Sequence, residues 1–306
     1  MAVIEIEGLR KEYTKLRGGR TVALQGLDLS VPTGGVFGFL GPNGAGKTTT
    51  IRCLLGLVRP SQGRMSLLGA DVQHDLPKVI ARVGSIVEAP AMFPRFSGRR
   101  NLQILARIHG EGETAIDAAL DRVGLADRAG DLVKTYSLGM KQRLAIAATL
   151  LRDPALLILD EPANGLDPAG IVEVRELVRS LGAEGRTIFI SSHILSEVQQ
   201  TADHVAIVAK GRLITSGPVG EVLTTGGRGL LVKVADLQAA RRVLTEAQIP
   251  AVPAGAALKV DVPTEQAERI SRTLAEAGLF VTELRPDEVD LETVFLELTK
   301  DQGVGD

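Results

Sequence analysis

The sequence predicts an α/β protein whose main domain is built on a mostly parallel β-sheet, followed by a small α+β domain. Short apolar runs of strand length alternate with helical stretches over most of the chain. One run, Val36–Leu40, ends in a glycine-rich turn that leads directly into a helical stretch, Thr48–Leu57. After a second glycine-rich segment, residues 226–229, strands and helices follow in a different order.

Apolar runs bounded by polar or turn residues predict the strands of the main sheet. They are Val36–Leu40, Val83–Val87, Ala155–Leu159 and Thr187–Ile190. Continuous apolar runs suit strands that are buried on both faces, as in a parallel sheet. The first residues, 1–7, alternate apolar and acidic side chains, which predicts a further strand and not a signal peptide.

Residues 97–151 show a helical pattern with no good strand, which predicts a helical subdomain inserted in the main domain. Ser97 can cap a first helix, on which Leu102, Leu105, Ala106 and His109 share one face. A second helix is expected near residues 115–123. A third is expected from Gly139 to Leu151, where Asp153-Pro154 stops it.

The glycines near residues 224–229 predict a domain boundary, with a main domain over residues 1–224 and an accessory domain over 229–300. The accessory domain begins with a strand at 230–234 and a helix capped by Asp236. Its further pattern gives the order βαββαβ, the split βαβ arrangement, with the last strand at Leu279–Leu284 and a closing helix over 290–298. It contains no catalytic constellation.

Composition limits the function classes. The net charge of −2 gives no electrostatic reason to expect a nucleic-acid partner. The single cysteine, Cys53, cannot form an internal disulfide, which favours the cytoplasm, and its apolar neighbours predict a buried thiol. No apolar run reaches the roughly 18 residues that cross a bilayer. Any role at a membrane therefore needs a partner.

The glycine-rich turn is the strongest functional signal. Residues 41–49 fit the pattern G-x-x-x-x-G-K-[ST] between a strand and a helix, the context that a phosphate-binding loop requires. Backbone amides of such a loop point at phosphate oxygens, and the helix N-terminus adds its positive field. Lys47 would reach the β- and γ-phosphates, and the Thr48 hydroxyl would bind Mg²⁺. The expected ATP-binding residues here are Gly41, Asn43, Gly44, Ala45, Gly46, Lys47, Thr48 and Thr49.

Two adjacent acids end the buried strand at residues 155–159. Asp160 suits Mg²⁺, and Glu161 could polarise the attacking water. Together with the phosphate loop, this pair indicates a nucleotide-hydrolysing enzyme, but it leaves kinases, GTPases and ATPases open.

The segment Tyr136–Arg143 opens a helix shortly before these acids and resembles the signature motif of ABC ATPases, usually written L-S-G-G-Q. Ser137 and Gly139 are kept, whereas Tyr136, Leu138 and Met140 replace the leucine, the first glycine and the glutamine. A helix N-terminus of this kind binds anions. In the family, the site it serves belongs to the other subunit of a dimer, and Ser137, Gly139 and Met140 would take that role.

Other motifs follow in the order of the ABC family. Asn164–Asp167 resembles the D-loop that crosses the dimer interface, with Asp167 as its acid. His193 matches the switch histidine, which would bond the γ-phosphate and hold the water with Glu161. Tyr13 lies where the family places an aromatic ring that stacks on adenine.

The resemblance covers residues 2–220 and implies the ABC fold, a P-loop NTPase core with a helical subdomain and an antiparallel β edge. It implies an ATPase that binds ATP and Mg²⁺ and closes as a homodimer, since every motif is present in one chain. It also implies an integral membrane permease on a separate chain, which would hold the protein at the inner face of the cell membrane.

One residue departs from the family. Glu88 stands where most members have a glutamine, and its carboxylate would still offer an oxygen to Mg²⁺ or to the water. The stretch 88–94 and the tail 291–298 look like those of drug, bacitracin and lantibiotic export ATPases. Two alternatives stay open: a soluble ABC ATPase acting on ribosomes or DNA, and a small-molecule kinase on the same loop.

Overall fold

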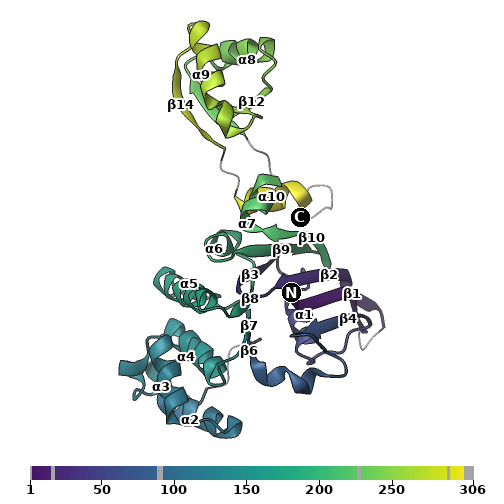
Figure 1. Cartoon of the computed structure of the whole chain (residues 1–306), viewed down its shortest axis with the longest axis vertical. Coiled ribbons are helices and arrows are strands. Elements are labelled where there is room, and N and C mark those ends of the chain that lie inside the picture. The colour runs from purple at the N-terminus through teal and green to yellow at the C-terminus, as the bar shows by residue number, and fades with distance from the viewer. Residues whose placement is uncertain (1, 15–17, 88–91, 226–228, 288–289, 300–306) are drawn as a thin grey trace. The chain divides into compact units, whose positions relative to one another are not determined.

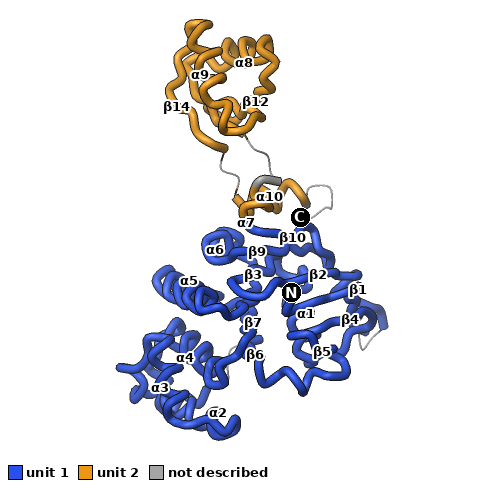
Figure 2. The backbone as a smooth tube through the Cα atoms, viewed as in Figure 1, with its two compact units in different colours: residues 1–219 blue, residues 220–306 orange. Residues whose placement is uncertain are grey.

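The computed structural model describes residues 2–14, 18–87, 92–225, 229–287 and 290–299. The chain forms two compact units, residues 1–219 and residues 220–306 (Figure 2). The fold class predicted from sequence, an α/β domain with an antiparallel β edge and a helical subdomain plus an α+β unit, is confirmed. The domain bounds 1–224 and 229–300 stay predictions.

The first unit is centred on a six-stranded sheet in the order β10-β9-β3-β8-β7-β6 (Figure 1). Its neighbouring strands are parallel, except that β10 is antiparallel to β9. The carboxyl ends of β3, β7 and β8 therefore meet at one edge of the sheet, where α/β proteins bind ligands. The strands are β3 (Gly35–Leu40), β6 (Val83–Ile86), β7 (Leu156–Asp160), β8 (Thr187–Ser192), β9 (His204–Ala209) and β10 (Arg212–Pro218).

A second, antiparallel sheet has the order β2-β1-β4-β5. Helix α1 (Lys47–Leu54) shares one hydrophobic core with both sheets, in which Ile4, Ile51 and Phe189 are buried. Helix α1 ends before the predicted Leu57, because Gly56 turns the backbone at φ 69°. The strands of this sheet are β1 (Ala2–Thr14), β2 (Arg20–Pro32), β4 (Gln62–Leu67) and β5 (Ala70–Asp71).

Helices α5 (Pro168–Ala183) and α6 (Leu195–Gln199) pack against β3 and β8 of the large sheet. Successive residues of a strand face opposite sides, so Phe189 of β8 points into the core that contains α1, while Ile190 faces α5 and α6. The polar ends of β7 and β8 thus lie between two helical layers. Two short 3₁₀ helices, Leu76–Lys78 and Ile80–Arg82, connect β5 to β6.

The helical subdomain consists of α2 (Gly98–His109), α3 (Glu113–Arg122) and α4 (Leu138–Leu150), with 3₁₀ turns at Ala126–Arg128 and Val133–Thr135. The three helices contact one another. The predicted cap is confirmed: the Ser97 hydroxyl accepts the Arg100 amide at 3.1 Å. Of the predicted face, Leu102 and Ala106 are buried, whereas His109 is exposed.

The second unit contains an antiparallel sheet in the order β12-β13-β11-β14 with two main helices, which gives the predicted βαββαβ order. Asp236 caps α8 by accepting the amides of Gln238 and Ala239, as predicted. Strand β14 begins two residues later than the predicted Leu279. The elements are α7 (Val219–Thr225), β11 (Leu230–Val234), α8 (Leu237–Glu246), β12 (Ala251–Ala254), β13 (Ala257–Val260), a 3₁₀ turn (Thr264–Gln266), α9 (Ala267–Glu276), β14 (Val281–Pro286) and α10 (Leu291–Thr299).

Within the described ranges, every helix is too short or too polar to span a membrane.

Candidate functional site

The loop between β3 and α1 is held in a conformation that only glycine permits at its last position. Gly46 precedes α1 with φ 105°. A Cβ atom on Gly46 would lie 2.7 Å from Leu24 Cδ2 and 2.9 Å from the Ala23 carbonyl oxygen. Both the backbone angle and the lack of space exclude a side chain. The loop amides thereby gather at the N-terminus of α1, where an anion is favoured.

Lys47, the first residue of α1, is buried, with 6% of its surface exposed. Its ammonium donates to the Gly41 carbonyl at 2.7 Å and lies 3.4 Å from the Pro42 carbonyl. It also lies 3.2 Å from Glu161 Oε1. A buried ammonium needs such partners, and these hold its charge beside the loop.

Glu161 follows β7 and lies between two cationic or polar neighbours. Its Oε1 faces Lys47, and its Oε2 lies 2.7 Å from Nδ1 of His193. The Glu161 backbone has φ 49°, a left-handed conformation that costs a non-glycine residue about 1–3 kcal/mol. Strain of this kind persists where neighbours fix the residue.

Asp160 and Glu161 are both tied to Ser191, which the sequence analysis did not single out as a site residue. The Ser191 hydroxyl donates to Asp160 Oδ1, and its oxygen accepts the Glu161 amide at 3.0 Å. Two hydroxyl residues at the end of a buried strand, Ser191-Ser192 before His193, were the signal that could have found it.

Lys47, Glu161 and His193 line a pocket of about 450 Å³ over the loop. Sequence reasoning missed Thr21, Val22 and Ala23 of β2, because nothing in their pattern shows that β2 lies beside the loop. It also did not place Asn164 in this pocket. Gly41, Asp160 and Tyr13 do not line it. The lining residues are Thr21, Val22, Ala23, Asn43, Gly44, Ala45, Gly46, Lys47, Thr48, Thr49, Glu161, Asn164 and His193.

The donor set beside the loop suits Mg²⁺. In the described part of the chain, the Thr48 hydroxyl and Asp160 Oδ2 have no hydrogen-bond partner and so can serve a ligand. The described residues include no cluster of three or more histidine, cysteine or carboxylate side chains able to hold a metal. Mg²⁺ does not need one, because it uses one or two carboxylates together with substrate phosphates and water. The predicted ligand Glu88 lies outside the described residues.

Comparisons with known proteins agree with this geometry. Residues 24–164 match the ABC transporter family. The chain is 37% identical to the bacitracin transport ATP-binding protein BcrA of Enterococcus faecalis, over 99% of this chain and 98% of that protein. It is 43% identical to the lantibiotic transport ATP-binding protein SrtF of Streptococcus pyogenes, over 69% of this chain and 89% of that protein.

This chain belongs to the ATP-binding subunits of the ABC transporter family. It is therefore an ATPase. Among solved structures it resembles cbiO1 from Clostridium perfringens, described as part of the ABC transporter complex cbiONQ. The TM-score is 0.65 and the identity 29%, over 81% of this chain and 96% of that one.

The ABC signature segment lies at the start of α4, outside the pocket. The Ser137 hydroxyl caps α4 by accepting the Met140 amide at 3.1 Å. Tyr136, which replaces the usual leucine, is buried, and its hydroxyl donates to the Arg128 carbonyl at 2.6 Å. Burial raises the pKa of Tyr136. Gly139 has room for a methyl group, since its nearest neighbour would be Gly170 Cα at 3.6 Å.

Asp167 and Tyr13 also lie outside the pocket. Asp167 caps α5 by accepting the Gly170 amide at 3.0 Å. Tyr13 pairs across the strands with Thr21, a lining residue, and the Lys11 ammonium lies 4.9 Å from the centre of its ring. Tyr13 is 38% exposed.

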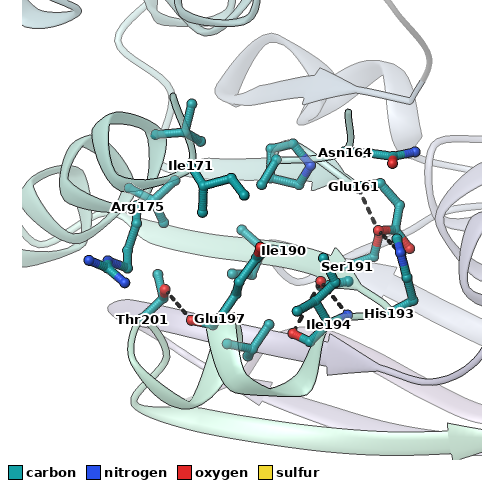
Figure 3. Close-up of a pocket in the computed structure, with 16 residues that line it drawn as sticks. Glu161, Asn164, Ile171, Arg175, Ile190, Ser191, His193, Ile194, Glu197 and Thr201 are labelled. Atoms are coloured by element: carbon teal, nitrogen blue, oxygen red, sulfur yellow. Dashed lines mark hydrogen bonds and ion pairs between the residues drawn. The ribbon is translucent and has the colours of Figure 1, made fainter. Parts of the chain in front are cut away.

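A second, smaller pocket of about 40 Å³ lies behind Glu161, Ser191 and His193 (Figure 3). Apolar side chains of α5, such as Ile171, form much of its wall. Glu197 of α6 also lines it. Burial raises the pKa of the Glu197 carboxyl, and the nearby His193 opposes this by lowering it. The volume has room for about three or four water molecules at roughly 10–15 Å³ each.

Proposed function

We propose that this chain hydrolyses ATP to drive an integral membrane permease on a separate chain that exports an antibiotic, a peptide or a lipid-like molecule. The relatives named for bacitracin and lantibiotic transport support this class of substrate. The observation that carries the ATPase assignment is the line of contacts Lys47–Glu161–His193 beside the phosphate loop.

The proposed roles follow from charge and position. Loop amides and Lys47 hold the phosphates, which requires Lys47 to exchange Glu161 for the γ-phosphate. Glu161 then polarises the attacking water, and His193 holds that water and the γ-phosphate. Tyr13 stacks on adenine. Loop residues Gly41, Asn43, Gly44, Ala45, Gly46 and Thr49 complete the ATP-binding set.

Mg²⁺ is the proposed cofactor, bound by Thr48, Asp160 and Glu88 together with phosphate oxygens. When bound, it neutralises charge on the phosphates during transfer. The unpartnered oxygens of Thr48 and Asp160 support the first two ligands.

We further propose that two copies of this chain form a homodimer in which Ser137, Gly139, Met140 and Asp167 complete the site of the other copy. The open space at Gly139 supports this. Packing within this chain would accept a larger residue at position 139. A need for glycine there would therefore come from a ligand or a partner chain.

The permease would dock on the helical subdomain and hold the protein at the inner face of the cell membrane. Phe93 and Phe96, whose ring centres lie 5.4 Å apart, are 54% and 42% exposed. Exposed paired aromatic rings are costly in water and typical of an interface. Both residues lie beside the segment that contains Glu88.

The test is a pull-down of the tagged chain from its own cells in mild detergent, with bound proteins identified by mass spectrometry. A membrane protein with several spans should copurify with the wild type and with Ile108→Ser, an exposed α2 residue used as the control. Phe93→Ser/Phe96→Ser should lose it and keep ATP binding. Ribosomal or DNA-repair proteins instead of a permease would contradict the proposal.

A further inference from the structure

The hydroxyl of Ser191 is buried and makes two hydrogen bonds. Ser191 is 0% exposed in β8, inside the six-stranded sheet. A buried hydroxyl without partners would cost about 1–3 kcal/mol, and a serine is therefore kept in such a place only with hydrogen bonds. Its partners are Asp160 Oδ1 and the Glu161 amide, so both bonds go to the two acids of the site and none to a structural group elsewhere.

The two bonds constrain different parts of the acids. The donated bond fixes one carboxylate oxygen of Asp160 and leaves Oδ2 to a ligand. The accepted bond fixes the backbone of Glu161 at its left-handed φ of 49°, together with a 3.2 Å bond to the Ser191 carbonyl oxygen. The strand register pairs Ser191 directly with Asp160, the last residue of β7.

We propose that Ser191 is a positioning residue for ATP hydrolysis, which orients Asp160 toward Mg²⁺ and holds Glu161 against the attacking water. This inference rests on the proposed function of the two acids. Groups that orient metal ligands and catalytic acids typically change metal affinity or activity by about 10–100-fold when removed. Ser191 itself does not line the nucleotide pocket and acts on it through Glu161.

The kinetic effects of substitutions at Ser191 distinguish a positioning role from a role in packing. Because Ser191→Ala leaves the loop intact, the KM for ATP should change little, whereas kcat should fall by about tenfold or more. The Mg²⁺ concentration at half-maximal rate should rise severalfold. Ser191→Thr keeps the hydroxyl that bonds both acids, so this variant should recover most of both properties.

Thr187→Val is the matched control. Thr187 lies in the same strand and is equally buried, and its hydroxyl oxygen accepts the Gly34 amide at 2.8 Å, far along the strand from the acids. Its loss should lower the melting temperature without changing kcat, KM or the Mg²⁺ requirement.

The test measures ATPase kinetics and binding of a fluorescent ATP analogue, in EDTA and in Mg²⁺, with the full chain. We expect Ser191→Ala to bind the analogue normally in EDTA but to gain less affinity from Mg²⁺ than the wild type. This inference, but not the proposed function, would be overturned if Ser191→Ala showed wild-type kinetics and a wild-type response to Mg²⁺. It would also be overturned if Ser191→Thr lost as much activity as Ser191→Ala. A wild-type chain that showed no Mg²⁺-dependent nucleotide binding would overturn the proposed function as well.

Discussion

Buried polar side chains of the nucleotide-binding unit each bond to a defined group, and that group shows what the side chain does. Asn101 and Thr187 bond backbone groups of other segments, and Thr50 donates to the Gly46 carbonyl at the start of α1. Lys47 and Ser191 also contact the acids at the carboxyl end of β7. Because unpaired buried polar groups are costly, these contacts separate structural from functional positions better than residue type alone.

Cys53 should be inert in the folded protein. It is 0% exposed, and burial raises the pKa of its thiol to about 11. The reactive thiolate is therefore suppressed. A fluorescent maleimide at pH 7.5 should label the chain only after denaturation, with the denatured chain as the reference. Rapid stoichiometric labelling of the native protein would contradict this.

The raised pKa of Cys53 also makes the free energy of unfolding depend on pH. The unfolded thiol ionises near pH 9.0 and the folded one near 11. Cys53 therefore contributes stability below pH 9.0, and this contribution is lost as the pH rises through 11. Cys53→Ala should remove this part of the alkaline decline, measured by denaturant unfolding between pH 8 and 11.

Among the elements, Asn101 of α2 clamps the loop that presents the exposed phenylalanines. Its amide oxygen accepts the Phe93 amide at 2.7 Å, and its nitrogen donates to the carbonyls of Phe93 and Ser97. Asn101→Ala would leave the Phe93 amide without this partner, whereas the Phe93 and Ser97 carbonyls keep the amides of Phe96 and Asn101. The substitution should cost about 1–3 kcal/mol of unfolding free energy.

Thermal unfolding of Asn101→Ala checks this prediction. Gln103→Ala on the same helix is the control, because its side chain bonds only exposed partners. A change in Asn101→Ala no larger than in the control would show that the clamp contributes little.

The sequence predicted the elements well where a local signal exists. Ser97 and Asp236 cap α2 and α8 as their positions indicated. The end of α1 was placed too late, because the turn at Gly56 depends on carbonyls of the preceding helix and not on the apolar pattern. The two hydroxyl residues before His193 mark Ser191 as polar, but its bond to Asp160 depends on the pairing of β7 with β8 and joins residues that lie thirty-one positions apart.

For the whole molecule, the phosphate loop and the acids were predictable because their motifs are local. The order of the strands could not be predicted from the sequence, and this order brings Thr21 and Val22 to the pocket. The assignment of Ser137, Gly139, Met140 and Asp167 to a dimer rests on family likeness together with the space at Gly139.

If two copies of the chain form a homodimer, Gly139→Ala should lower the ATPase activity without lowering the melting temperature. The added methyl group meets nothing closer than 3.6 Å within the chain, so the melting temperature should stay near that of the wild type. ATP hydrolysis should nevertheless fall by tenfold or more, roughly 1.4 kcal/mol or more, because the start of α4 would face the other copy's nucleotide. Normal turnover in Gly139→Ala would argue against that arrangement.

ATP with Mg²⁺ should stabilise the first unit. A ligand present at 100 times its dissociation constant adds about 2.7 kcal/mol to the unfolding free energy of the unit that binds it. Calorimetry of the full chain should show a shift in the transition assigned to residues 1–219 and none in residues 220–306. Equal shifts in both transitions would show that the two units unfold as one.

The most direct test of the ATPase site is phosphate release by purified Glu161→Gln compared with the wild type. This variant keeps the shape of Glu161 but removes the charge that faces Lys47 and His193. We expect turnover to fall by at least a hundredfold, about 2.7 kcal/mol in activation free energy, with ATP binding retained or tighter because Lys47 is released. Wild-type turnover by Glu161→Gln would contradict the role assigned to Glu161 and the account of the site built around it.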